Sequence, residues 1–253
     1  MRGIVLAGPT GVGKTDLSLK LAKILGADII SCDSAQVYEE MNIGTAKIRE
    51  DEMEGIKHYM LDVLPPTHKY SVGEYQRAVD KILAEKEKEN KPVILTGGTG
   101  LYINSVVNGL SALPESNPEL REKLMNLSAE ELYEKLKELD IEAAEAIHMN
   151  NKKRVDIMME DGLLYEVENL YKKYGSETLR KINIIGYTQL IDYIEGKITL
   201  ERAVEFIKRD SRRYAKRQMT WFNNDDGYLW FDLENQSEND ILKSIIEHYS
   251  IGV

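Results

Sequence analysis

The residues best suited to chemistry stand near the start of the chain, where an apolar run at 4–7 leads into Gly8-Pro9-Thr10-Gly11-Val12-Gly13-Lys14-Thr15. This segment fits the GxxxxGK[ST] pattern of a phosphate-binding P-loop between a strand and a helix. Gly11 and Gly13 let backbone N–H groups turn towards a phosphate at a helix N-terminus, whose dipole favours anions. Lys14 adds a positive charge, and the Thr15 hydroxyl is a ligand for Mg²⁺. The segment therefore predicts a site for phosphate groups and magnesium.

Two other segments predict polar side chains near this loop. Asp33 ends a second apolar stretch, and Thr99 lies in a glycine-rich run that follows a third. In a parallel sheet, ligands bind beyond the carboxyl ends of the strands. We therefore expect Asp33 and Thr99 to face the P-loop. The alternative for Asp33 is a helix N-cap, a role to which aspartate is equally suited.

An α/β fold must position these segments. Strand patterns alternate with helical patterns at residues 4–7, 28–33 and 92–96, which predicts a P-loop NTPase-like parallel sheet flanked by helices. Between 114 and 150, short helical patterns follow one another without strands. We expect a small all-helical insert there, and an α/β core with C-terminal helices at 1–113 and 151–253.

The C-terminal part adds further elements. A long helical pattern begins near Arg154, and Gly162 is expected to weaken or bend it. Residues 182–187 form a connector to a short helix. Near the end of the chain, residues 228–231 have the pattern of an edge strand, and a terminal helix follows.

Composition bounds the class of protein. The chain has 253 residues and a net charge of −10. Its single cysteine, Cys32, excludes an internal disulfide framework, and we expect it to be a small buried residue of a strand. No stretch has the length and apolarity of a transmembrane span or of a secretory signal. We expect a cytoplasmic protein. Its acidity argues against general nucleic-acid affinity, although the charge is unevenly distributed.

One segment of this acidic chain is rich in basic residues. Thr199 is expected to cap a helix that reaches about Phe222, and its basic side chains fall within one arc of about 100°: Arg202, Arg209, Arg213, Lys216 and Arg217. Apolar residues, including Tyr214 and Trp221, occupy the other side. Such a stripe either contacts phosphates or RNA, or is simply a solvated face.

Several segments together resemble the tRNA dimethylallyltransferases. The matching stretches are GPTGVGKT (8–15), DSAQVY (33–38), MNIGTAK (41–47), YSVGEYQRAV (70–79), GGTGLY (97–102) and AKRQMTWF (215–222). The resemblance implies transfer of a dimethylallyl group from dimethylallyl diphosphate to N6 of adenosine 37 of tRNA, with Mg²⁺ present and diphosphate released. The P-loop would then hold a diphosphate leaving group. It implies no membrane partner, and we expect a monomer.

The resemblance also implies residue roles. Asp33 matches the carboxylate that takes the N6 proton, and Thr99 matches the residue that touches the oxygen between the prenyl carbon and the diphosphate. Lys14 and Arg154 match cations on the diphosphate. The positions that match tRNA contacts are Asp33, Ser34, Ala35, Gln36, Thr99, Arg121, Gly186, Tyr187, Lys216, Arg217 and Gln218.

The chain departs from this family after His148. Members usually have several tens of residues, including a helix and a strand, between a HPNDPQR-like segment and an arginine-led RVDxMxxxGLxxEV helix; here the two are fused, and Arg154 fits the second. The shortening leaves a protein that binds tRNA without catalysis as one alternative. A P-loop phosphotransferase acting on a nucleoside or small metabolite is the other.

Overall fold

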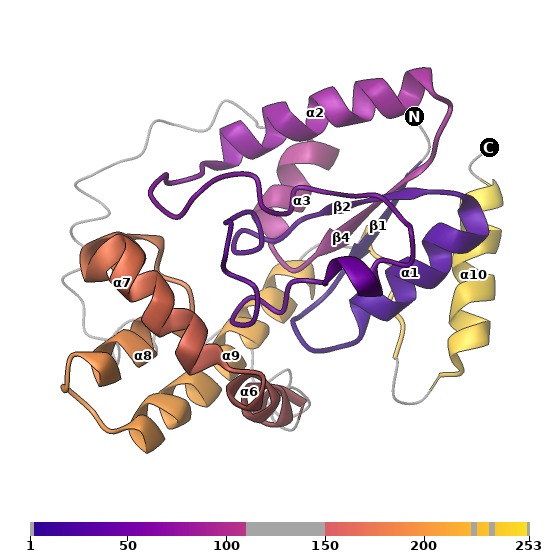
Figure 1. Ribbon diagram of the computed structural model, residues 1–253. Coiled ribbons are helices and arrows are strands. Elements are labelled where there is room, and N and C mark those ends of the chain that lie inside the picture. Colours follow the sequence, from indigo (N-terminus) through magenta and orange to yellow (C-terminus); the bar gives the residue numbers. More distant parts are fainter. Residues whose placement is uncertain (1–2, 110–149, 224–226, 233–235, 252–253) are drawn as a thin grey trace, which may run out of the picture.

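The centre of the molecule is an entirely parallel sheet (Figure 1). The computed structural model describes residues 3–109, 150–223, 227–232 and 236–251. Within these residues the sheet has four strands in the order β1-β4-β2-β3: β1 (Gly3–Ala7), β2 (Asp28–Ser31), β3 (His58–Tyr59) and β4 (Val93–Gly97). Because all strands run the same way, β1, β2 and β4 deliver the P-loop, Asp33 and Thr99 to one edge, as predicted.

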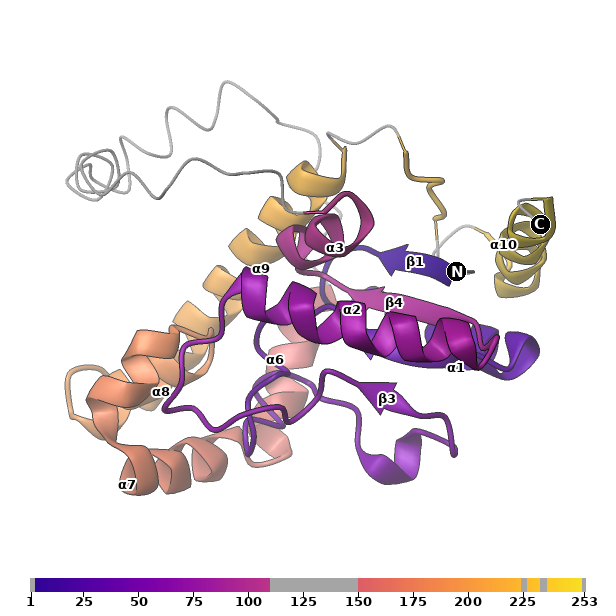
Figure 2. The same cartoon turned by 90° about the horizontal axis from the view of Figure 1, so that it is seen from above.

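Alternating side chains of the central strands fill two apolar layers. On one face, Ile30 and Leu95 pack with residues of α2 (Val72–Lys88) and α3 (Gly100–Val107). On the other face, Ile29 and Ile94 pack with α1 (Lys14–Leu25) and α10 (Glu238–Ile251). Successive strand residues point to opposite faces, so a strand that is apolar throughout serves both layers. Figures 1 and 2 show these helices around the sheet.

A group of helices lies beside the strand ends (Figures 1 and 2). It contains α6 (Asn150–Glu160), α7 (Leu163–Ile182), α8 (Tyr187–Ile194) and α9 (Leu200–Asn223). A separate 3₁₀ turn, η1 (Glu50–Glu52), lies between β2 and β3 in the chain. The Thr199 hydroxyl accepts the backbone N–H of Arg202, so the predicted cap of α9 is confirmed. Gly162 does more than bend a helix: its φ of 99° is left-handed, and it separates α6 from α7.

The sequence-based prediction was wrong at two strands. β3 was not foreseen, because two residues are too short to show a period; they pair with Ile29 and Ile30 of β2. Residues 228–231 were predicted as an edge strand but form none. Side-chain packing holds this segment instead, since the Tyr228 ring meets Phe222 edge-on at 5.5 Å and Phe231 packs against the α1–α10 layer.

The predicted helical insert at 114–150 and Arg121 fall outside the described residues, apart from the first residue of α6. Among the helices that are described, none combines the length and apolarity needed to cross a bilayer.

Candidate functional site

The P-loop has the backbone needed to surround an anion. Gly11 and Gly13 both adopt φ of 88°, a left-handed conformation that costs glycine little, and α1 begins directly at Lys14. The Lys14 ammonium folds back and donates to the carbonyl oxygen of Pro9 at 2.7 Å. A loop of this shape at a helix N-terminus presents N–H groups and a positive dipole to a phosphate.

Three charged side chains converge beside this loop. Burial lowers the pKa of Lys14 to about 8; the negative charge of Asp33 opposes this shift and the positive charge of Arg154 adds to it. Burial likewise lowers the pKa of Arg154, and the negative charge of Asp33 again opposes this shift. Two partly dehydrated cations and one carboxylate therefore lie within electrostatic reach of one another, and an anionic ligand beside them would relieve the repulsion between the cations.

Hydrogen bonds between Thr99 and Ser34 connect the turn after β4 to the turn after β2, where Asp33 lies. The Thr99 hydroxyl oxygen accepts the backbone N–H of Ser34 at 3.0 Å and lies 3.3 Å from the Ser34 hydroxyl. One carboxylate oxygen of Asp33 accepts the N–H of Ala35 at 2.8 Å. Residues 34–37 form a turn and not a helix, so the helix N-cap alternative for Asp33 is not observed, and its carboxylate stabilises this turn. The same residue nevertheless lies within electrostatic reach of Lys14 and Arg154.

Two cavities meet at the P-loop. The first, of about 550 Å³, is lined by the turn after β2, by the end of α7 with the 183–186 connector, and by residues of α6 and α9, including Asp33, Arg154, Arg213 and Arg217. The second, of about 1230 Å³, extends along β1 and is lined by α3, α10 and the segment 227–232. Lys14 lines the second cavity, and Thr10 lines both. A molecule bound at the P-loop is therefore accessible from two sides.

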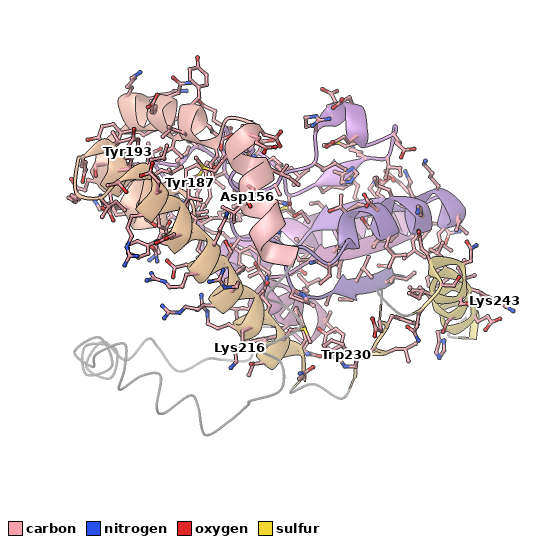
Figure 3. All side chains as sticks on the ribbon, turned by 90° about the horizontal axis from the view of Figure 1, so that it is seen from below. Asp156, Tyr187, Tyr193, Lys216, Trp230 and Lys243 are labelled. Carbon is pink, nitrogen blue, oxygen red and sulfur yellow. The ribbon has the colours of Figure 1, made fainter. Side chains whose placement is uncertain are left out.

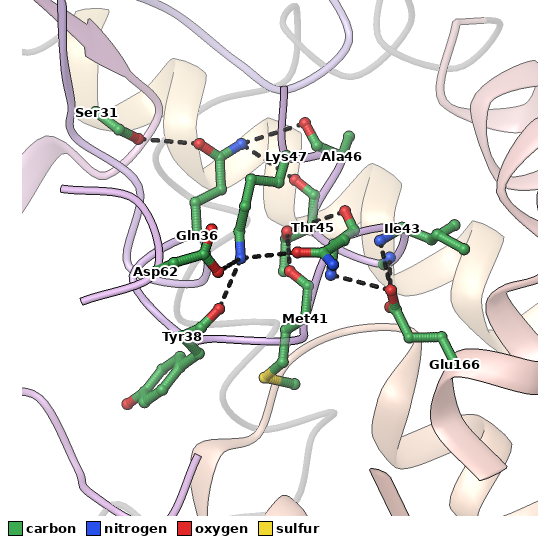
Figure 4. A network of polar contacts seen from close by, with 12 residues as sticks. Ser31, Gln36, Tyr38, Met41, Ile43, Thr45, Ala46, Lys47, Asp62 and Glu166 are labelled. Atoms are coloured by element: carbon green, nitrogen blue, oxygen red, sulfur yellow. Dashed lines mark hydrogen bonds and ion pairs between the residues drawn. The ribbon is translucent and has the colours of Figure 1, made fainter. Parts of the chain in front are cut away.

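A polar network shapes the loop between Asp33 and η1 (Figure 4). The Gln36 amide accepts from the Ser31 hydroxyl and donates to the carbonyl oxygens of Thr45 and Ala46. Buried Lys47 donates to the Tyr38 carbonyl oxygen and pairs with Asp62. These contacts give Lys47 of the MNIGTAK motif a structural role.

Glu166 fastens this loop to α7. Its carboxylate accepts the backbone N–H groups of Asn42, Ile43 and Gly44 at 3.0, 2.8 and 3.2 Å, and the hydroxyl of Tyr187 at 2.6 Å. A Cβ on Gly44 would lie 2.5 Å from the Tyr187 ring, so only glycine fits there. Glu166 is the glutamate of the RVDxMxxxGLxxEV pattern, but sequence reasoning gave it no contact, because its partners lie more than 20 residues away along the chain.

Six of the residues predicted to contact tRNA fall into two groups. Ser34, Ala35, Gly186 and Arg217 line the first cavity. In contrast, Tyr187 is fully buried and Gln218 is only 5% exposed. As the structure stands, neither side chain is available to a surface ligand, because each is enclosed by packing and hydrogen bonds within the protein.

The basic side chains of the predicted stripe are partly or fully exposed on α9, although part of their charge is internally paired. Nitrogen-tipped side chains project along the outer side of α9, with Lys216 near its end (Figure 3). Arg202 pairs with Glu205 and Arg209 with Asp210, which favours the solvated-face alternative for that half. Arg213 also lies 3.8 Å from Asp210, and both Arg213 and Arg217 border the first cavity.

Tyr214 is a further site residue that sequence reasoning placed on an apolar face. It lines the first cavity. Burial raises the pKa of its hydroxyl and the charge of Asp33 acts in the same direction, whereas hydrogen bonding to Thr99 and Gln218 lowers it. Tyr214 and Gln218 are four residues apart on one helix face, a spacing that could have identified them as neighbours.

Known proteins resemble the chain in both sequence and structure. An "IPP transferase" family model matches residues 36–155 and 152–225. A "tRNA dimethylallyltransferase" from Fusobacterium nucleatum is 46% identical over 299 residues, covering 99% of this chain and 98% of the relative. One from Clostridioides difficile is 41% identical, with 97% and 96% covered.

Solved structures agree with the sequence relatives. A tRNA delta(2)-isopentenylpyrophosphate transferase from Staphylococcus epidermidis has a TM-score of 0.81 and 33% identity, covering 99% of each chain. A tRNA isopentenylpyrophosphate transferase from Bacillus halodurans has a TM-score of 0.80 and 32% identity, covering 98% of this chain and 97% of the other.

The comparisons also locate the shortening expected after His148. The match to the Fusobacterium nucleatum relative spans 299 positions, so at least 46 of them have no counterpart in a chain of 253 residues. The two family matches meet at residues 152–155. The junction therefore lies in the first turns of α6, beside Arg154.

Proposed function

The chain belongs to the IPP transferase family, and we propose that it transfers a dimethylallyl group from dimethylallyl diphosphate to N6 of adenosine 37 in the anticodon loop of tRNA. The observation that carries the proposal is the convergence of Lys14, Arg154, Asp33 and Thr99 where two cavities meet at the P-loop. Breaking an allylic C–O bond requires stabilisation of the departing diphosphate. Forming the bond between the prenyl carbon and the adenosine N6 requires a base that takes the proton lost from N6. The four side chains provide both.

The leaving group is held by the P-loop. Backbone N–H groups at the start of α1, Lys14 and Arg154 neutralise the negative charge that grows on the diphosphate as the bond to the prenyl carbon breaks. Thr99 donates to the oxygen that joins this carbon to the diphosphate. The apolar walls of the second cavity suit the five-carbon chain of the donor.

A magnesium ion would fit this arrangement. Mg²⁺ is commonly held by one or two protein oxygens together with substrate phosphates, and Thr15 offers an exposed hydroxyl at the N-terminus of α1. When bound, the ion supplies additional neutralisation of the diphosphate charge.

The acceptor enters from the opposite side. A stacked base cannot reach Asp33, so adenosine must turn out of the anticodon loop into the first cavity. As N6 bonds to the prenyl carbon, the Asp33 carboxylate takes the proton that N6 loses. Arg213, Lys216 and Arg217 contact the RNA backbone near the cavity. Since tRNA is the substrate, we place the reaction in the cytoplasm, with the protein acting as a monomer.

The test is incubation with dimethylallyl diphosphate and an unmodified tRNA transcript, followed by mass spectrometry of the nucleosides. We expect prenylated adenosine and tRNA-dependent release of diphosphate. A matched transcript with guanosine at position 37 carries an oxygen in place of the N6 amine and should remain unmodified. Consumption of ATP with no prenyl transfer would instead indicate a phosphotransferase, and tRNA binding with neither reaction would indicate a protein that only binds.

A further inference from the structure

Gln218 connects three segments that are far apart in the sequence. From the inner face of α9, its side-chain oxygen accepts the backbone N–H of Thr10 at 2.9 Å. Its side-chain nitrogen donates to the carbonyl oxygen of Gly98 at 3.0 Å. One buried amide thus holds the P-loop and the turn that carries Thr99 in a single arrangement.

The packing around this amide is close. A Cβ on Gly98 would lie 2.0 Å from the Gln218 nitrogen, and a Cβ on Gly100 would lie 2.1 Å from the Trp221 ring. Gln218 and Trp221 are three residues apart, so one face of α9 lies directly on the GGTG turn. The glycines of this turn therefore allow α9 to approach the backbone, in addition to any contact with substrate.

We propose that Gln218 is a positioning residue that fixes the P-loop relative to Thr99. This inference rests on the proposed function, because it concerns the same site. Thr10 lines both cavities, and its N–H is the group that Gln218 holds. An amide is suited to the place because it offers an acceptor to one loop and a donor to the other. The clamp sets the distance between the diphosphate and the Thr99 hydroxyl, and Gln218 acts on the reaction without touching tRNA.

Gln218→Met tests the clamp, because methionine keeps the length of the side chain and removes the hydrogen bonds to Thr10 and Gly98. We expect affinity for inorganic diphosphate, measured by calorimetry with Mg²⁺ and without tRNA, to fall about tenfold. The kcat for transfer should fall by roughly 100-fold, the scale expected when reacting groups shift by about 1 Å. The Kd for tRNA measured without diphosphate should stay within about twofold.

Two further variants make the test specific. Thr220→Val is the control, since it removes a hydrogen bond from the same turn of α9, to the Lys216 carbonyl oxygen, and leaves both loops untouched. It should behave as wild type. Gly98→Ala places a Cβ 2.0 Å from the Gln218 nitrogen and 3.3 Å from the Gly8 carbonyl oxygen, so the Gln218 amide is the group that must move most. This variant should reproduce the loss of diphosphate affinity, even if Gln218→Met folds poorly.

Wild-type diphosphate affinity in the Gly98→Ala variant, or loss of tRNA affinity alone in Gln218→Met, would overturn the proposal. The second result would return Gln218 to a direct contact with tRNA. A wild-type protein that binds diphosphate but transfers no prenyl group would contradict the proposed function, while the affinity measurement would still report on the clamp.

Discussion

The Asp33 carboxylate has a structural role and, in the proposed function, a chemical one. One oxygen accepts the N–H of Ala35 and shapes the turn after β2, and the same group lies within electrostatic reach of Lys14 and Arg154. A carboxylate has two oxygens, so holding one in a turn still lets the other accept a proton. The structural and chemical roles of Asp33 are therefore compatible.

Asp33→Asn should separate these roles. The amide oxygen can still accept from Ala35, so the turn and diphosphate binding should persist, but an amide cannot take the N6 proton. We expect single-turnover transfer to slow by about 10²- to 10⁴-fold, with diphosphate affinity nearly unchanged. Wild-type turnover would leave Asp33 with its turn-forming role alone.

The pKa of Lys14, lowered to about 8 by burial, predicts a pH dependence of diphosphate binding. Only the protonated lysine attracts the anion, so affinity should fall as pH rises through about 8. Binding the anion favours the charged form, so the protein should take up protons on binding near this pH. Calorimetry in buffers of different ionisation enthalpy measures that uptake.

Lys14→Arg is the matched control for this measurement, because arginine stays protonated. Proton uptake in this variant should fall to that expected from the ionisation of diphosphate alone. Equal uptake by both proteins would show that Lys14 does not titrate in this range.

Among the elements, α6 is the one that the shortening affects most directly. The two family matches meet within it, and Arg154 projects from it into the first cavity. α6 contacts both α7 and α9, which keeps it in place beside the P-loop. The element that carries the second cation is thus retained although the segment before it is shortened.

Arg154→Ala should lower affinity for dimethylallyl diphosphate and slow transfer, with a smaller effect on tRNA binding measured without diphosphate. Arg154→Lys should restore function only in part, because an ammonium cannot copy a two-pronged contact to phosphate oxygens. Titration of donor and of tRNA against each variant checks both statements. Damage to tRNA binding alone would assign Arg154 to the RNA.

At the scale of the whole molecule, the distribution of charge matters more than its sum. The chain carries a net charge of −10, yet α9 presents basic side chains along its outer side (Figure 3). Those nearest the first cavity, Arg213 and Arg217, are exposed where an anticodon loop would have to approach. An acidic protein can bind RNA through such a face.

We expect tRNA affinity to weaken steeply with salt, because phosphate contacts release counterions. Replacing both Arg213 and Lys216 by alanine should reduce the slope of log Kd against log salt by roughly one to two. Arg202→Ala is a useful comparison, since Arg202 is already paired with Glu205, and it should change the slope less. An unchanged slope in the double variant would place the RNA surface elsewhere.

Local patterns in the sequence were enough to identify the P-loop, the strands that carry it and Asp33, and the cap of α9 at Thr199. Each depends on neighbouring residues: a loop motif between a strand and a helix, a run of apolar residues, or a hydroxyl three positions before an N–H. Such features are encoded within about one element of chain, and the family resemblance added roles to them.

Only the tertiary structure decided what depends on distant residues. The burial of Tyr187 against Glu166, the two-residue strand β3 and the packing of residues 228–231 without a strand all arise from contacts between separate elements. Gln218 is the clearest case, because its partners Thr10 and Gly98 lie 208 and 120 residues away. A buried amide and a surface amide look the same in a sequence, since what distinguishes them is the other segments that fold around them.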